Sequence, residues 1–100
     1  MLFAFMLMDK AGAGPLRQKM RPVHKAYLAE VQDRIAFAGP LVADDDAATM
    51  VGSLLVIEFP SREAAHAWLA QEPFMQAGLF ASTSVQAFVN LWPQKAGCQA

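Results

Sequence analysis

The sequence predicts one α+β domain with a ferredoxin-like βαββαβ order, in which four strands form a single antiparallel sheet. Its 100 residues suit one domain. Strand-like apolar runs alternate with two amphipathic segments in the order strand, helix, strand, strand, helix, strand. The first and third strands are apolar on both faces. We assign residues 1–93 to this domain and residues 94–100 to a flexible C-terminal tail.

The first strand is predicted over residues 2–8, where every position is apolar, so that both of its faces should be covered. Asp9 closes this strand at an end of the sheet where loops meet. Such ends often border pockets. Asp9 is therefore a candidate binding residue, and a turn-forming role is the alternative.

The first helical region is expected to have two parts. A short helical turn is predicted at Pro15, and a longer helix is predicted to start at Pro22, because a proline at the first helical position loses no hydrogen bond. A single helix kinked at Pro22 is the alternative. Val23, Tyr27 and Val31 recur every four residues and form the predicted inward face.

The second strand is predicted over residues 35–42 and the third over residues 51–59. Gly39 and Pro40 interrupt the second strand, which should therefore lie at an edge or carry a bulge. The third strand is apolar on both faces through its middle, which is typical of a central strand.

The second helix is predicted over residues 62–70, with Ser61 as its N-cap and Ala65, Trp68 and Leu69 facing inward. The last strand is predicted over about residues 84–92, where apolar residues alternate along the chain.

Two helices can cover only one face of a four-stranded sheet. The composition also indicates surplus apolar surface, since 55% of the residues are hydrophobic and only 17% are charged, against about 45–50% and about 25% in an average domain. The simplest cover for the bare face is the same face of a second copy. We therefore expect a homodimer in which two sheets pack with barrel-like character, with a higher oligomer left open.

Several classes of function are disfavoured. The net charge is −1, and the basic residues of the first helical region are spaced out without aromatic stacking partners, so no nucleic-acid partner is expected. The apolar first eight residues are too short for a membrane span, which needs about 20. The single cysteine, Cys98, excludes an intrachain disulfide and fits a reducing compartment, so that a cytoplasmic location is predicted.

The candidate chemistry centres on His24, which borders the apolar helical face, and on Glu72, which directly precedes Pro73. A histidine–carboxylate pair is the smallest set of side chains that can transfer a proton efficiently near neutral pH. The alternatives are a histidine that bonds a backbone carbonyl and a glutamate that caps the helical turn starting at Pro73. The two roles of Glu72 are compatible.

Other polar residues are weaker candidates. Arg21 either binds an anionic substrate or stays solvated at the helix start. Ser53 is a candidate hydrogen-bond donor to a ligand, but it lacks the G-x-S-x-G context of a serine nucleophile. His66 is expected to be exposed. The two histidines have no metal-binding spacing, so neither a metal nor a cofactor is expected.

Several short motifs, in order over about residues 1–92, resemble the YciI-like (YCII-related) family of small bacterial proteins. The matching pieces are Met8-Asp9-Lys10, Arg21-Pro22-Val23-His24, Ala38-Gly39-Pro40, Gly52-Ser53, Val56-Ile57-Glu58-Phe59, Ala64-Ala65-His66-Ala67-Trp68, Glu72-Pro73-Phe74 and Ala77-Gly78. The resemblance implies a dimeric α+β barrel and a His–Asp active site.

The histidine of that site corresponds to His24, and the aspartate of the family's D-P-[FY] motif corresponds to Glu72. The glutamate keeps the charge but adds a methylene, so Asp9 is an alternative partner for His24. The resemblance also implies an activity class: some relatives process chlorinated hydroxylated aromatics by proton transfer and chloride loss, and similar barrels host isomerases and cofactor-free or haem oxygenases.

We therefore predict a small cytoplasmic enzyme in which His24 and Glu72 perform general acid/base chemistry without a cofactor. Elimination, isomerisation or a related proton transfer on a small apolar or aromatic substrate is expected. The predicted substrate-binding residues are Asp9, Arg21, Ser53 and Phe74. A non-catalytic dimer that binds a small molecule and a purely structural dimer are the alternatives.

Overall fold

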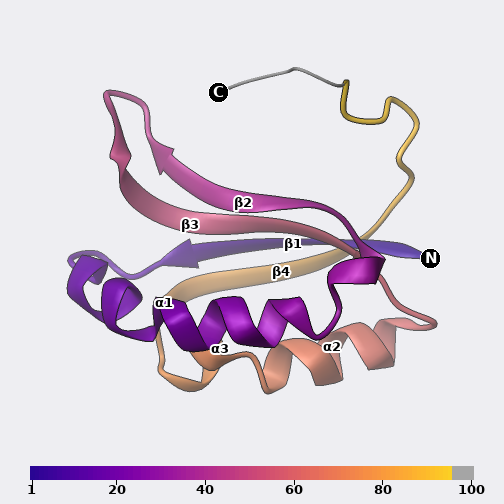
Figure 1. Ribbon diagram of the computed structural model, residues 1–100, viewed down its shortest axis with the longest axis horizontal. Coiled ribbons are helices and arrows are strands. Elements are labelled where there is room, and N and C mark those ends of the chain that lie inside the picture. Colours follow the sequence, from indigo (N-terminus) through magenta and orange to yellow (C-terminus); the bar gives the residue numbers. More distant parts are fainter. Residues whose placement is uncertain (96–100) are drawn as a thin grey trace.

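The computed structural model describes residues 1–95 and confirms the predicted ferredoxin-like α+β fold (Figure 1). Its strands form one antiparallel sheet in the order β2-β3-β1-β4. The predicted tail lies mostly outside the described residues, as does Cys98. The elements are β1 (Leu2–Asp9), α1 (Gly14–Ala29), a 3-10 turn (Gln32–Arg34), β2 (Ile35–Ala43), β3 (Asp46–Glu58), α2 (Arg62–Ala70), α3 (Pro73–Gln76) and β4 (Phe80–Phe88).

The helices all lie on one side of the sheet (Figure 1). Alternate residues of β1 face them, because successive side chains of a strand point to opposite faces. Phe3, Phe5 and Leu7 pair with Ile57, Leu55 and Ser53 of β3, which places all six on the helical side. The core of buried residues consists of Phe3, Phe5, Leu7, Val31, Leu55, Ile57, Phe59, Ala65 and Leu69. The same register therefore brings the hydroxyl of Ser53 to the helical side, next to the apolar core.

The edge position predicted for β2 is confirmed. β2 pairs only with β3 among the described strands, and its register shifts near Ile35 and again near Val42. Gly39 and Pro40 lie between these shifts. A proline is tolerated there because an edge strand leaves one row of backbone groups unpaired.

The division of the first helical region at Pro22 is wrong. α1 runs without a break from Gly14 to Ala29, with Pro15 in its first turn and Pro22 inside it. A proline inside a helix removes one backbone hydrogen bond, and here it lies on the exposed side. Val23, which was predicted to face inward, is 53% exposed, whereas the neighbouring His24 is buried; Val31 is buried as predicted.

The predicted bounds of the last strand are also corrected. β4 spans Phe80–Phe88 and not residues 84–92, because Leu2 at the start of β1 pairs with Phe88. No residue of β1 lies beyond Leu2 to pair with Val89. The alternation in the sequence therefore continues past the point where the sheet ends.

The second helix and the turn after it form as predicted. Ser61 caps α2 by accepting a hydrogen bond from the backbone N–H of Ala64 at 3.1 Å. Ala65 and Leu69 are buried, and Trp68 packs against the core. No helix within residues 1–95 is long and apolar enough to cross a membrane.

The other face of the sheet carries no helix within the described residues (Figure 1). This open face, defined by the outward side chains of β1 and β3 and their neighbours on the edge strands, is largely apolar. Its apolar side chains are Leu2, Ala4, Met6, Met8, Phe37, Leu41, Leu54, Val56 and Phe88. The rings of Phe37 and Phe88, from opposite edge strands, are in contact, with their centroids 6.3 Å apart. Met6 is the most exposed of these side chains, at 43%, whereas Val56 is buried.

Candidate active site

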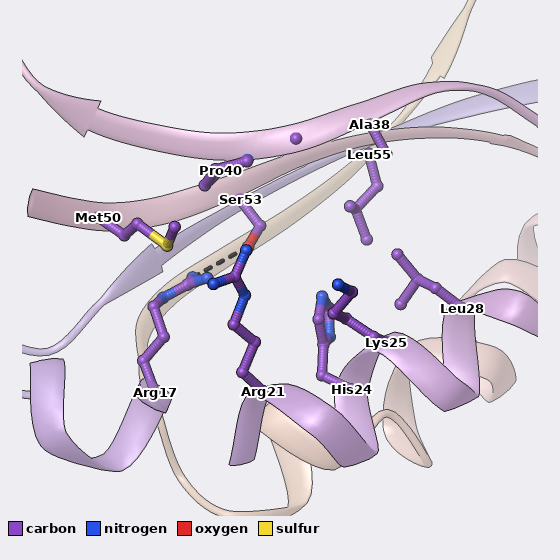
Figure 2. A pocket seen from close by; sticks show the side chains of 11 residues that line it. Arg17, Arg21, His24, Lys25, Leu28, Ala38, Pro40, Met50, Ser53 and Leu55 are labelled. Carbon is purple, nitrogen blue, oxygen red and sulfur yellow. Dashed lines mark hydrogen bonds between the residues drawn. The ribbon is translucent and has the colours of Figure 1, made fainter. Parts of the chain in front are cut away.

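A cavity of about 240 Å³ lies between α1 and the strands β2 and β3 (Figure 2). Its two walls differ in character. The helical wall consists of Arg17, Arg21, His24, Lys25 and Leu28, and the sheet wall consists of Ala38, Gly39, Pro40, Met50, Ser53 and Leu55. The helical wall is mostly basic because these five positions lie along one side of the continuous helix.

His24 and Glu72 are in direct contact, although 48 residues separate them in the sequence. His24 Nδ1 lies 2.5 Å from Glu72 Oε1. The Glu72 side chain is fully buried, and that of His24 is 11% exposed. The contact joins α1 to the start of α3. The structure therefore brings together the two residues predicted as the catalytic pair.

Glu72 also has the capping role that was predicted as its alternative. Its backbone is extended at the start of α3, where Pro73 occupies the first helical turn, and its Oε2 accepts a hydrogen bond from the backbone N–H of Met75 at 3.2 Å. One carboxylate oxygen thus caps α3 while the other holds His24. The cap fixes the position of the carboxylate, and the carboxylate in turn orients the imidazole.

The contact with Glu72 sets which ring nitrogen of His24 is available. In the neutral ring, a proton on Nδ1 is donated to the carboxylate, so Nε2 carries the free lone pair. Nε2 makes no side-chain hydrogen bond within residues 1–95, and no buried side-chain nitrogen or oxygen there lacks a partner. Since His24 lines the cavity, Nε2 is the atom that a bound molecule can reach.

Phe74 holds the ring of His24 from behind. The two rings are stacked, with centroids 3.9 Å apart and planes 11° from parallel. Phe74 is fully buried and does not line the cavity. The structure thus places this predicted substrate-binding residue as a support for His24, which limits rotation of the imidazole.

Arg17 joins the other two predicted polar residues. Its guanidinium donates two hydrogen bonds to Asp9, at 2.7 and 3.0 Å, and one to Ser53 Oγ at 2.9 Å. Arg17 is only 5% exposed, and its Cζ lies 4.7 Å from the centroid of the Phe74 ring. Asp9 therefore binds Arg17 and not His24, and the alternative pairing of Asp9 with His24 is not formed.

Arg17 was not among the site residues predicted from the sequence. Arg17 precedes His24 by seven residues, which is two helical turns, so both lie on the same side of α1. Splitting the helix at Pro22 removed this relation. The seven-residue spacing of Arg17 and His24 therefore predicts that both face the cavity, provided that the helix is continuous.

The remaining candidates are placed as follows. Arg21 lines the cavity, and Ser53 lines it while bonded to Arg17. His66 is exposed on α2, as predicted. Within residues 1–95, no three His, Cys, Asp or Glu side chains lie close enough together to hold a metal ion.

Tyr27 joins α1, which carries His24, to α2. Its hydroxyl donates a hydrogen bond to the backbone carbonyl of Trp68 at 2.7 Å, and the two rings stack at 5.1 Å. Burial raises the pKa of Tyr27, and the negative charges of Glu30 and Glu72 raise it further. The phenol therefore stays protonated and remains a donor.

The fold and the site together define an α+β protein with a histidine–carboxylate pair at the wall of an open cavity. A family model described as the YCII-related domain matches residues 1–89. The chain is 38% identical over 98 residues to Protein YciI of Escherichia coli O6:H1, which covers 92% of this chain and 100% of that protein. It is 34% identical over 82 residues to an uncharacterized protein of Haemophilus influenzae, covering 76% and 84%. The chain belongs to the YCII-related family, as its motifs predicted.

A solved structure is also closely similar. It is that of 5-chloro-2-hydroxyhydroquinone dehydrochlorinase (TftG) from Burkholderia phenoliruptrix AC1100 in complex with 2,5-dihydroxybenzoquinone. The TM-score is 0.83 at 33% sequence identity, and the match covers 89% of this chain and 94% of that one.

Proposed function

We propose that the chain is a cytoplasmic, cofactor-independent enzyme in which His24 Nε2 is the general acid/base for elimination or isomerisation of a small ring compound. The observation that carries this proposal is the contact between His24 Nδ1 and the buried carboxylate of Glu72, beside an open cavity. A carboxylate at Nδ1 orients the ring and stabilises the imidazolium that forms when Nε2 accepts a proton. Phe74 keeps the ring in that orientation.

The similarity to the dehydrochlorinase supports one form of this chemistry. Loss of hydrogen chloride from a chlorinated hydroxylated ring removes one proton and one chloride from the same molecule, so the step needs no oxidant. We propose that one hydroxyl proton of the ring first moves to the carbon that bears chlorine, and that Nε2 then takes up a second hydroxyl proton while the carbon–chlorine bond breaks and a carbonyl group forms. The imidazolium later releases this proton to water. The apolar residues Leu28, Pro40 and Leu55 would hold the ring in the cavity.

The test is the release of chloride from 5-chloro-2-hydroxyhydroquinone, incubated with the purified chain in the absence of oxygen. We expect release that rises in proportion to protein concentration and exceeds that of the buffer blank. Binding of the ring compound without any release would reject the enzyme and support the alternative, a non-catalytic dimer that binds small molecules.

We also propose that the open face pairs with the same face of a second copy. Met6 lies at its middle and is 43% exposed, and the apolar segment after β4 adds Trp92, which is 88% exposed. Two such faces packed together would form the barrel-like assembly expected from the sequence.

Met6→Asp should therefore halve the mass measured by light scattering, because a charge buried between two apolar sheets is costly. The matched control is Val23→Asp, an equally apolar and exposed position on the helical side, which should leave the mass unchanged. Circular dichroism establishes that each variant is folded. A folded Met6→Asp variant with the mass of the parent would reject this face as the interface.

A further inference from the structure

We infer that the ligand of the cavity is an organic anion with its charge on an oxygen attached to a ring, of the phenolate or hydroxyquinone type, and that Arg21 and Lys25 bind this oxygen. The inference rests on the proposed function for the reacting group, His24, and for the hydroxylated ring of the ligand; the negative charge of the ligand is argued from the cavity. Binding itself can be measured without turnover.

The charges of the site leave two cations without partners. Both carboxylates that contact the helical wall are occupied, Glu72 by His24 and Asp9 by Arg17. Within residues 1–95, neither Arg21 nor Lys25 makes an ion pair or a side-chain hydrogen bond. Three permanent cations thus face two carboxylates, in a chain whose net charge is −1. Arg21 and Lys25 are exposed to solvent, so their charges are available to an anionic ligand that enters the cavity.

The two cations are placed where they can reach a ligand of His24. Arg21 precedes His24 by three residues and Lys25 follows it directly, and all three line the cavity. Figure 2 shows the side chains of Arg21 and Lys25 projecting from α1 toward the opposite strands. A guanidinium is well suited to an anionic oxygen because its several N–H donors are always charged.

Arg21 also lies at the junction of two hollows. It lines the cavity of His24 and a second cavity of about 280 Å³, together with Arg17 and Met50. The second cavity is bordered by polar Gln18 and Thr49. An anionic oxygen held at Arg21 would therefore point toward the second, more polar cavity, and the ring would lie in the cavity of His24.

The cavity of His24 indicates the nature of the rest of the ligand. Leu28, Pro40 and Leu55 present apolar surface across from the charged groups. Such a wall favours a ring over a strongly hydrated inorganic anion, because the ring removes this surface from water. The combination of an apolar wall and two free cations selects an amphipathic anion.

The probe for this inference is 2,5-dihydroxybenzoquinone, which is an anion at neutral pH because each hydroxyl is conjugated to a carbonyl. Its neutral counterpart is 2,5-dimethoxybenzoquinone, which has the same ring. Titration calorimetry should show that the anion binds at least about tenfold more tightly, because hydrogen bonds to charged groups are stronger than those between neutral groups. Arg21→Gln should abolish most of this tenfold preference for the anion, and Lys25→Gln should reduce it.

The matched control is Lys19→Gln, which removes a charge from the same helix at an exposed position that lines neither cavity. It should leave the affinity for the anion unchanged. Equal binding of the two probes, an unchanged affinity in Arg21→Gln, an equal loss in Lys19→Gln, or no binding of the anion at millimolar concentration would each overturn the inference. Exposed substitutions of this kind change stability little, so the variants should fold.

The His24→Gln variant separates this inference from the proposed function. It should keep its preference for the anion, because Arg21 and Lys25 are intact. Anion-selective binding by the parent chain without any turnover would reject the proposed enzyme alone. Turnover of a ring substrate with no dependence on its charge would reject the anionic ligand alone.

Discussion

His24→Gln should lower the rate of turnover by about 100- to 10,000-fold, which is the usual contribution of a general acid or base. Glutamine is polar and can donate a hydrogen bond to Glu72, so that the buried carboxylate keeps a partner. It cannot accept a proton and release it again near neutral pH. The measurement is the rate of chloride release, with the substrate at saturating concentration.

His66→Gln is the matched control, because it makes the same substitution at an exposed histidine of α2. This variant should keep the turnover and the thermal stability of the parent chain. Full turnover in His24→Gln would show that another group moves the proton. Unfolding of His24→Gln would instead assign His24 a structural role.

Glu72→Ala should reduce the free energy of unfolding by about 3–5 kcal/mol, the typical cost of removing one partner of a buried pair. The substitution removes the acceptor of two donors at once, His24 Nδ1 and the backbone N–H of Met75. It also leaves a cavity between α1 and α3. Because a domain is stabilised by only about 5–15 kcal/mol, the loss is large. Urea unfolding followed by tryptophan fluorescence measures it.

Two comparisons define the source of that loss. Glu72→Gln keeps the shape of the side chain and an oxygen for the cap, so it should be less destabilising than Glu72→Ala. Glu63→Ala removes an exposed glutamate from the first turn of α2 and should cost no more than about 1 kcal/mol. If Glu72→Ala were no less stable than Glu63→Ala, the buried pair would contribute nothing to the fold.

The order of the strands in the sheet could be predicted because it depends on whether one or both faces of each strand are apolar. β1 and β3 are apolar on both sides, and this pattern alone makes them central. The bounds of β4 could not be predicted, since they depend on where its partner ends: the pairing of Leu2 with Phe88 ends the sheet, although the alternation continues to Leu91. The register of a strand pair depends on both strands and cannot be predicted from the sequence of either one alone.

The site was predictable to the extent that its chemistry is local. The reach of Glu72 could not be judged from the sequence, because the added methylene acts through the position of α3. The structure shows the carboxylate of Glu72 in contact with Nδ1 of His24. Arg17 was not predicted as a site residue for a different reason. Pro22 favours a helix start locally, but the packing of one long helix against the sheet outweighs the single hydrogen bond that the proline removes.

The protonation of the two ring nitrogens of His24 tests the central claim most directly. Nitrogen-15 NMR of the His66→Gln variant, which leaves His24 as the one histidine of the chain, distinguishes the two neutral forms of the ring. We predict that the proton of the neutral ring resides on Nδ1, bonded to Glu72, with Nε2 unprotonated and open to the cavity, and that Glu72→Gln disturbs this preference. A neutral ring protonated on Nε2, or one that exchanges freely between the two forms, would contradict the assignment of Nε2 as the base.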